Sequence, residues 1–255
     1  MKFKKTRQQG FTLVEMAMVL VILGFVLAAL LLPLQAQRQQ LAQSQTENTL
    51  ELAKQALLGF AQSNGRLPCP AIVSGAESPL GGGTCTQQVG FLPAATLGIQ
   101  PTNAQGFAID AWNNPIRYAV NQSKVDITTG VAMTDNTFTI SSGMSNAGIA
   151  NLNQTPSLRV CMDSSAFTTT CSAPPVANEI NYLTNNAAAV IYSTGATGAQ
   201  GSVGRPDELA NLDGNTVFVS HDISLAAAPN EFDHLVTWIS PFVLYNAMIQ
   251  AGQLH

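Results

Sequence analysis

The chain has 255 residues, of which 11 are Lys or Arg and 15 are Asp or Glu, and its formal net charge is −4. Charged residues make up only 10% of the chain, against about 25% in typical soluble domains, so Asn, Gln, Ser and Thr must supply most of its polar surface. Four basic residues lie within the first ten positions (Lys2, Lys4, Lys5 and Arg7), and the remainder is acidic and has no basic cluster. This distribution argues against nucleic acid as a main ligand.

A long apolar run follows the basic leader. Residues 16–34 are 19 positions without a charged side chain. As a helix that rises about 1.5 Å per residue, they would span just under one bilayer core of about 30 Å. Glu15 stands at the head of this run, and placing a carboxylate in hydrocarbon costs roughly 2.5–3.5 kcal/mol, so it needs a partner or a function. The basic leader predicts a cytoplasmic N-terminus, with the bulk of the chain outside.

The segment Gly10-Phe11-Thr12-Leu13-Val14-Glu15, between the basic leader and the apolar run, resembles the type IV prepilin motif. The resemblance implies cleavage between Gly10 and Phe11 by a prepilin peptidase, and N-methylation of Phe11 as the new N-terminus. It also implies a role in assembly for Glu15. The helix proline of this family usually falls one residue earlier than Pro33 does here, and one residue turns a kink by about 100° around the helix.

Two other classes of N-terminus compete with the prepilin motif. A secretory signal peptide would end in a small-residue cleavage site, and Leu34-Gln35-Ala36 is a poor one because Leu34 is large. A carboxylate at the head of the apolar region is also wrong for a signal peptide. An ordinary single-pass anchor would leave Glu15 without a role.

Helical spacing continues beyond the apolar run. One apolar stripe recurs at intervals of three and four residues, at Leu50, Ala53, Leu57 and Phe60. Ser63-Asn64-Gly65 is a stop signal, and Pro68 prevents continuation. The pattern predicts one helix from about Phe11 to about Gln62. The first half would be buried in membrane or filament, and the second half would pack on a globular domain.

Four cysteines (Cys69, Cys85, Cys161 and Cys171) lie beyond the apolar run, on the expected oxidising side of the membrane. Four cysteines allow three connectivities. The local pairs Cys69–Cys85 and Cys161–Cys171 are the simplest, because each closes a short loop. A zinc site is disfavoured because there is no C-x-x-C pair and no nearby histidine.

Short strands are expected after a loop-rich region at 65–99. Their expected ranges are 116–120, 125–139, 158–161, 187–192, 216–220 and 235–239. Together they are expected to form an antiparallel set, followed by a short helix that begins at Ser240-Pro241 and ends at Gly252. The fold class is therefore α+β: a long N-terminal helix against an antiparallel sheet, with a short C-terminal helix.

Two local segments carry a second, weaker resemblance, to the pseudopilins of type II secretion. Residues 110–115 read D-x-W-x-N-P before a strand with a tyrosine, and residues 193–195 read Ser-x-Gly after a buried strand. On physical grounds the first segment is interpreted as a hairpin turn with a buried Trp112.

No catalytic motif is present in the sequence. Ser220-His221-Asp222 holds triad residue types, but neighbours in a strand point to opposite faces. Asp233-His234 is interpreted as a polar edge of the last strand. Four carboxylates between residues 195 and 222 are weak calcium candidates, because carboxylate oxygens suit that ion: Asp207, Glu208, Asp213 and Asp222. Their spacing matches no compact calcium loop, so the alternative is a solvated acidic loop, and no cofactor is expected otherwise.

The sequence thus predicts four parts: a leader (1–10), a transmembrane and assembly helix (11–34), its amphipathic continuation (35–64) and a periplasmic or extracellular domain (65–255). The resemblance implies a non-enzymatic subunit, more consistent with a minor than a major one, of a type IV pilus or a secretion pseudopilus. Its expected partners are the prepilin peptidase, other pilins or pseudopilins, an inner-membrane assembly platform, and membrane lipid before assembly. The alternative is a membrane-anchored periplasmic binding or adhesion domain that does not polymerise.

Overall fold

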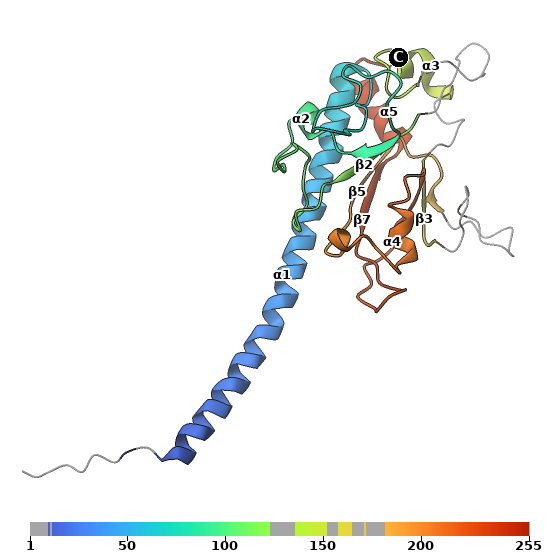
Figure 1. Cartoon of the computed structure of the whole chain (residues 1–255). Coiled ribbons are helices and arrows are strands. Elements are labelled where there is room, and N and C mark those ends of the chain that lie inside the picture. The colour runs from blue at the N-terminus through green and yellow to red at the C-terminus, as the bar shows by residue number, and fades with distance from the viewer. Residues whose placement is uncertain are drawn as a thin grey trace, which may run out of the picture. The chain divides into compact units, whose positions relative to one another are not determined.

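The structure is a computed structural model that describes residue 10 and residues 12–122, 136–151, 158–164, 171 and 182–254 (Figure 1), without the side chains of residues 28–36 and 149–151. The chain divides into two compact units, Met1–Ser44 and Gln45–His255. Each unit is described by itself below.

Helix α1 (Leu13–Asn64) runs through both units. In the first unit its described side chains from Leu13 to Leu27 are exposed. Within the described residues, no helical segment combines the length and the apolarity that crossing a bilayer requires.

In the second unit, α1 buries one stripe of small and aliphatic side chains: Leu50, Ala53, Leu57 and Ala61. The prediction named Phe60 as the fourth member, but Phe60 is only half-buried and its ring lies under the guanidinium of Arg66, at 5.0 Å. Gly65 ends the helix with a φ of 67°, and a Cβ there would lie 2.5 Å from the carbonyl oxygen of Ser141. Only glycine is compatible with both conditions.

The first sheet is antiparallel and has the strand order β1-β2-β5-β7. Its strands are β1 (Val89–Phe91), β2 (Arg117–Val120), β5 (Ala189–Ser193) and β7 (Leu235–Ile239). The α1 stripe, one face of this sheet and the C-terminal helix form a single hydrophobic core. This arrangement confirms the predicted α+β fold with a long helix on an antiparallel sheet.

A second sheet covers the other face of the first. Its order is β4-β3-β6, with β4 (Tyr182–Thr184), β3 (Arg159–Cys161) and β6 (Val217–Val219). A second core, which includes Tyr192 and Val190 from β5 and Phe218 from β6, packs between the two sheets. β3 and β6 are parallel, so the prediction of one antiparallel set is wrong for this pair. The strands are far apart in sequence, and side-chain alternation carries no information about strand direction.

Four short helices and one 3₁₀ turn complete the described fold: α2 (Ala94–Leu97), α3 (Gly143–Asn151), η1 (Gly198–Gln200), α4 (Pro206–Ala210) and α5 (Pro241–Gln250). The helix α5 begins at the predicted Ser240-Pro241, but the Ser240 side chain makes no capping hydrogen bond. Of the strand expected at 125–139, residues 125–135 lie outside the described residues, and residues 137–139 form turns.

Candidate functional site

The start of α1 is held by a pair of residues that face each other across the first turn. The backbone N–H of Thr12 and its hydroxyl both donate to Oε2 of Glu15, at 2.8 and 2.9 Å. In return the N–H of Glu15 donates to the Thr12 hydroxyl, at 3.3 Å. This is a capping box, in which a Thr at the N-cap and a Glu three residues later satisfy each other's backbone groups.

The capping box assigns a role to Thr12 that the sequence analysis missed. The signal was present, because Thr-x-x-Glu before an apolar run is the sequence pattern of such a box. Thr12 lies between the predicted cleavage site and Glu15, and the two residues of the box are joined across the first turn of α1. Phe11 lies outside the described residues.

Gly10 meets no steric restriction from the described part of the chain. A Cβ built on it has no described atom within 4 Å, and its φ is not in the left-handed region. The described residues therefore give no reason for glycine at this position.

The four cysteines form the two local pairs. Cys69 and Cys85 have Cα atoms 5.3 Å apart, and Cys161 and Cys171 have Cα atoms 5.4 Å apart. Both separations lie within the usual range for disulfides. With both bonds formed, none of the cysteines remains as a thiol ligand for a metal.

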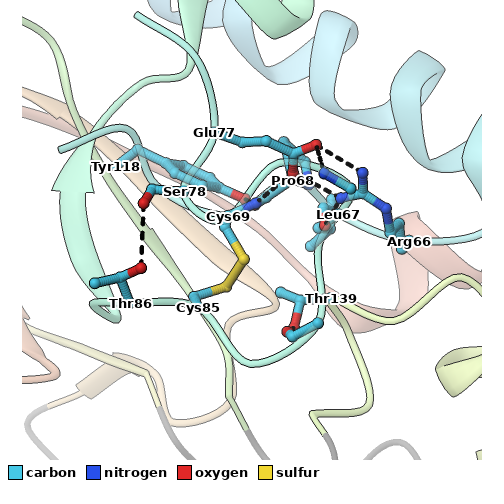
Figure 2. Close-up of a disulfide and its surroundings, with 12 residues drawn as sticks. Arg66, Leu67, Pro68, Cys69, Glu77, Ser78, Cys85, Thr86, Tyr118 and Thr139 are labelled. Carbon is cyan, nitrogen blue, oxygen red and sulfur yellow. Dashed lines mark hydrogen bonds and ion pairs between the residues drawn. A yellow bond between two sulfur atoms is a disulfide. The ribbon is translucent and has the colours of Figure 1, made fainter. Parts of the chain in front are cut away.

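A buried ion pair lies beside the first disulfide (Figure 2). Two guanidinium nitrogens of Arg66 donate to the two carboxylate oxygens of Glu77, each at 2.7 Å. The backbone N–H groups of Cys69 and Gly81 also donate to this carboxylate, at 3.1 and 3.2 Å. Burial alone would raise the pKa of Glu77, but the hydrogen bonds and the charge of Arg66 outweigh it, so the pKa lies below its usual value. The cluster links the residues that follow α1 to the disulfide loop. Each carboxylate oxygen of Glu77 accepts two hydrogen bonds, so neither is open to a metal ion.

The D-x-W-x-N segment forms the predicted turn, but its buried members differ from the prediction. Trp112 is only half-buried, whereas Asp110 and Asn114 are buried. Oδ1 of Asp110 accepts from the N–H groups of Trp112 and Asn114, and Oδ2 accepts from the Ser193 hydroxyl at 2.6 Å. The Asn114 amide donates to the carbonyl of Gly195 at 2.6 Å. The two segments that resemble pseudopilins are therefore joined by hydrogen bonds. Asp110 stabilises the turn by accepting hydrogen bonds from its backbone N–H groups.

The four calcium candidates enter separate interactions. Asp207 accepts from the N–H of Ser164 at 2.7 Å and lies 3.1 Å from Nε2 of His221. Asp213 bonds to Asn215, and Asp222 is exposed. Glu208 is fully buried, and burial raises its pKa above the usual value. Among the described residues, no metal-sized group contains more than one of the four, so calcium stays a prediction without a common site.

Glu208 instead belongs to a buried group with Asp233 and His234, whose ligand atoms lie within 4.8 Å of one another. The prediction that Asp233-His234 forms a polar edge is wrong, because both residues are buried ahead of β7. The Thr197 hydroxyl lies between the two carboxylates, 3.0 Å from Asp233 and 3.3 Å from Glu208. Burial, with smaller contributions from nearby arginine charges, lowers the pKa of His234 to about 3, so its ring is neutral.

The hydrogen bonds of Asn211 determine which nitrogen of the His234 ring carries the proton. Oδ1 of Asn211 accepts from the N–H of Val219 at 2.7 Å, and Nδ2 donates to the Val219 carbonyl at 3.0 Å, which fixes the orientation of the amide. The second Nδ2 hydrogen then points to Nδ1 of His234, 3.1 Å away. This assigns the proton of the ring to Nε2.

A metal at Nε2 would require the ring proton to move to Nδ1, where it would face the Nδ2 hydrogen of Asn211. The tautomer with its proton on Nε2 cannot act as base towards Ser202, whose hydroxyl is 3.5 Å from Nε2 and fully buried. The group is therefore a structural hydrogen-bond network. The Ser220-His221-Asp222 sequence forms no relay either, because Nε2 of His221 faces Asp207 and Nδ1 faces the backbone carbonyl of Asp222.

Comparison with protein families gives one match, at the N-terminus. Residues 5–31 match the prokaryotic N-terminal methylation motif, and this stretch contains the capping box and the Gly10–Phe11 junction. Comparison with curated proteins and with solved structures found no match. Proteins that carry this motif are structural rather than enzymatic, and the motif implies prepilin processing, a membrane-anchored N-terminus and assembly with other pilins. The chain therefore carries the signature of the type IV pilin and pseudopilin family.

Proposed function

We propose that this protein is a subunit of a pilus-like filament, a minor pilin or a pseudopilin, that assembles through its N-terminal helix. The observation that carries the proposal is the methylation motif at residues 5–31 together with the geometry of Glu15 inside it. The large globular unit that follows the helix favours a minor over a major subunit.

The environment of Gly10 supports processing by a prepilin peptidase. Because no described residue lies within 4 Å of a Cβ placed on Gly10, a peptidase that accepts only a small residue before the cleaved bond accounts for the glycine. Cleavage after Gly10 removes the four basic residues of the leader. The new N-terminal amine belongs to Phe11.

The carboxylate of Glu15 offers one oxygen to a neighbour. Thr12 directs both of its hydrogen bonds to Oε2, and no described residue donates to Oε1. In a filament core without water, a carboxylate requires a compensating charge. The Phe11 amine of a neighbouring subunit supplies that charge at Oε1, while Thr12 continues to hold Oε2. The pair neutralises both charges and sets the axial register of the subunits.

The proposed function also implies a membrane topology. Residues 11–34 form a single-pass anchor in the inner membrane, with the N-terminus in the cytoplasm and the second unit in the periplasm. The two disulfides of that unit agree with an oxidising compartment. A platform in the membrane would then transfer the anchored subunit from lipid into the filament.

The experiment that tests the proposal is the intact mass and N-terminal sequence of the protein isolated from membranes. A chain that begins with N-methylated Phe11 supports prepilin processing, and the Gly10→Val variant is expected to keep its leader. A chain that begins at Met1 would identify a plain anchor or tethered binding domain. A start near Gln37 would identify a secreted protein, and either result would refute the proposal.

Assembly is tested separately from processing. Glu15→Leu is expected to be inserted and cleaved normally but to enter filaments poorly, because no carboxylate remains for the neighbouring amine. Glu15→Asp is the matched control, since it keeps the charge on a shorter side chain. Normal incorporation of Glu15→Leu into filaments would contradict the pairing.

A further inference from the structure

Two peptide bonds in this chain have the composition that most favours spontaneous rearrangement, an Asn or Asp followed by glycine. They are Asn64-Gly65 and Asp213-Gly214. At such a bond the amide nitrogen of the glycine can attack the preceding side-chain carbonyl carbon, because glycine has no Cβ to obstruct the approach. The ring that forms then opens to an isoaspartyl linkage, in which the main chain runs through the side chain. Which bond reacts in the folded protein depends on its local structure.

The Asn64-Gly65 bond is held by the end of α1. The N–H of Gly65 donates to the carbonyl of Ala61 at 2.8 Å. Nδ2 of Asn64 donates to the carbonyl of Phe60 at 3.0 Å. Asn64 is the last residue of the helix, and Gly65 is buried. Because the glycine nitrogen can reach the side chain only after the last turn unwinds, this bond is protected even though Asn64 itself is exposed.

The Asp213-Gly214 bond lies in an exposed bend between α4 and β6. No described residue accepts a hydrogen bond from the N–H of Gly214. The φ of Gly214 is 79°, and a Cβ placed on it meets no described atom within 4 Å. The glycine nitrogen can therefore approach the side chain of Asp213 without the unwinding of any helix or strand.

The neighbouring Asn215 keeps the carboxyl group of Asp213 close to this bond. The N–H of Asn215 donates to Oδ1 of Asp213 at 2.9 Å, and Nδ2 of Asn215 donates to Oδ2 at 2.5 Å. An aspartate that accepts from the N–H two residues ahead forms an Asx turn. The turn folds the Asp213 side chain forward over Gly214 instead of leaving it extended into solvent.

We propose that Asp213 is the residue at which the folded protein forms isoaspartate. The nitrogen of Gly214 bonds to Cγ of the protonated Asp213 carboxyl, and the carboxyl hydroxyl leaves with the amide proton as water. A second water then opens the succinimide at one of its two carbonyl carbons. Attack at the side-chain carbonyl restores aspartate, and attack at the main-chain carbonyl leaves the isoaspartyl linkage. The reaction needs no oxidant and no cofactor.

The modification acts on β6 through Asn215. Oδ1 of Asn215 accepts from the N–H of Val217 at 2.7 Å, and Val217 is the first residue of β6, opposite Arg159 in β3. An isoaspartyl linkage adds one carbon to the main chain of the bend and transfers the free carboxylate from the side chain to the main-chain carbon. Both hydrogen bonds from Asn215 to Asp213 are then lost, and the amide of Val217 is expected to exchange faster with deuterium.

The matched variant is Asp213→Asn, which gives both bonds the same Asn-Gly chemistry, so that a difference in rate reports structure alone. The full chain in detergent micelles is incubated in mildly alkaline buffer, and loss of ammonia at each site is followed by peptide mass mapping. We expect residue 213 to react at least about tenfold faster than residue 64 in the folded protein, because opening of α1 must precede reaction at residue 64. After reduction and unfolding in urea, the two sites should react at similar rates.

In the unsubstituted chain, isoaspartate should accumulate at residue 213 without a change of mass, detected by enzymatic methylation of isoaspartyl groups. It should form faster in mildly acidic buffer, because the protonated carboxyl is the form that reacts. Asp213→Glu keeps the charge but requires a larger ring, and it is expected to form no such product. Equal rates at residues 213 and 64 in folded Asp213→Asn protein would overturn the proposal. So would the absence of isoaspartate at residue 213 of the folded chain after the unfolded chain has converted. None of these readouts depends on N-terminal processing.

Discussion

Removing the charge of Arg66 gives the sharpest test of how the globular unit is stabilised. Arg66→Met keeps the length of the side chain and removes both 2.7 Å bonds to Glu77. The carboxylate then remains buried with only the N–H groups of Cys69 and Gly81 as donors. Breaking a buried pair by removal of one partner costs about 3–5 kcal/mol, and the lost contact with the Phe60 ring adds about 0.5–1 kcal/mol.

A double-mutant cycle separates the pair from its surroundings. Glu77→Gln is nearly isosteric and leaves Arg66 buried without a charge partner. In the combined variant neither charge is buried alone, so its loss should be smaller than the sum of the two single losses by about 2–3 kcal/mol. Urea unfolding of the oxidised protein, followed by the fluorescence of Trp112 and Trp238, gives the free energies. A loss below about 1 kcal/mol for Arg66→Met, or additive single losses, would refute the assigned role of the pair.

Three further predictions concern pH and the start of α1. Because the folded pKa of Glu77 is lowered, its contribution to stability is present above the usual pKa and is lost as pH falls through the folded value; the acid unfolding profile of Glu77→Gln should lack this loss. The folded pKa of Glu208 is raised by burial, so its contribution is present below the usual pKa and is lost as pH rises through the folded value. Glu208→Gln should flatten that decline, and an unchanged slope would contradict the assignment. Thr12→Val should destabilise the start of α1 by about 1 kcal/mol while Thr12→Ser should not, measured as amide exchange at residues 13–15, and equal exchange in both variants would remove the capping role.

Much of the architecture could be predicted because it rests on local patterns. The long helix follows from its apolar spacing and from the Gly65 and Pro68 stop signals. The strand at 235–239 was predicted with its observed bounds, because β-branched and aromatic residues alternate there between flanking polar segments. Helix α5 followed from Ser240-Pro241, since proline at the first helical position is favoured whether or not the serine caps.

The remaining features depend on contacts between distant residues. β1 and β4 were not predicted: β1 has Gly90 at its centre and lies in the loop-rich region 65–99, and no sequence signal marks β4. The partner of Arg66 could not be read from the sequence, because Glu77 lies in a loop without periodicity. Among the acidic candidates only Glu208 is deeply buried, and its partners Thr197 and Asp233 come from separate loops. The exception is Thr12, whose capping pattern was readable and was overlooked.

The stripe on α1 also determines how the globular unit bears mechanical load. Leu50, Ala53, Leu57 and Ala61 form one line along the part of α1 that belongs to the second unit, so a pull along the axis of this part acts parallel to the stripe. Such a pull loads these contacts in shear, all at once, rather than peeling them one after another. At the far end of the stripe, the Arg66–Glu77 pair and the Cys69–Cys85 bond tie the next residues into the same unit. A unit built in this way resists extraction force along its helix axis and yields more readily to a sideways pull on the sheet.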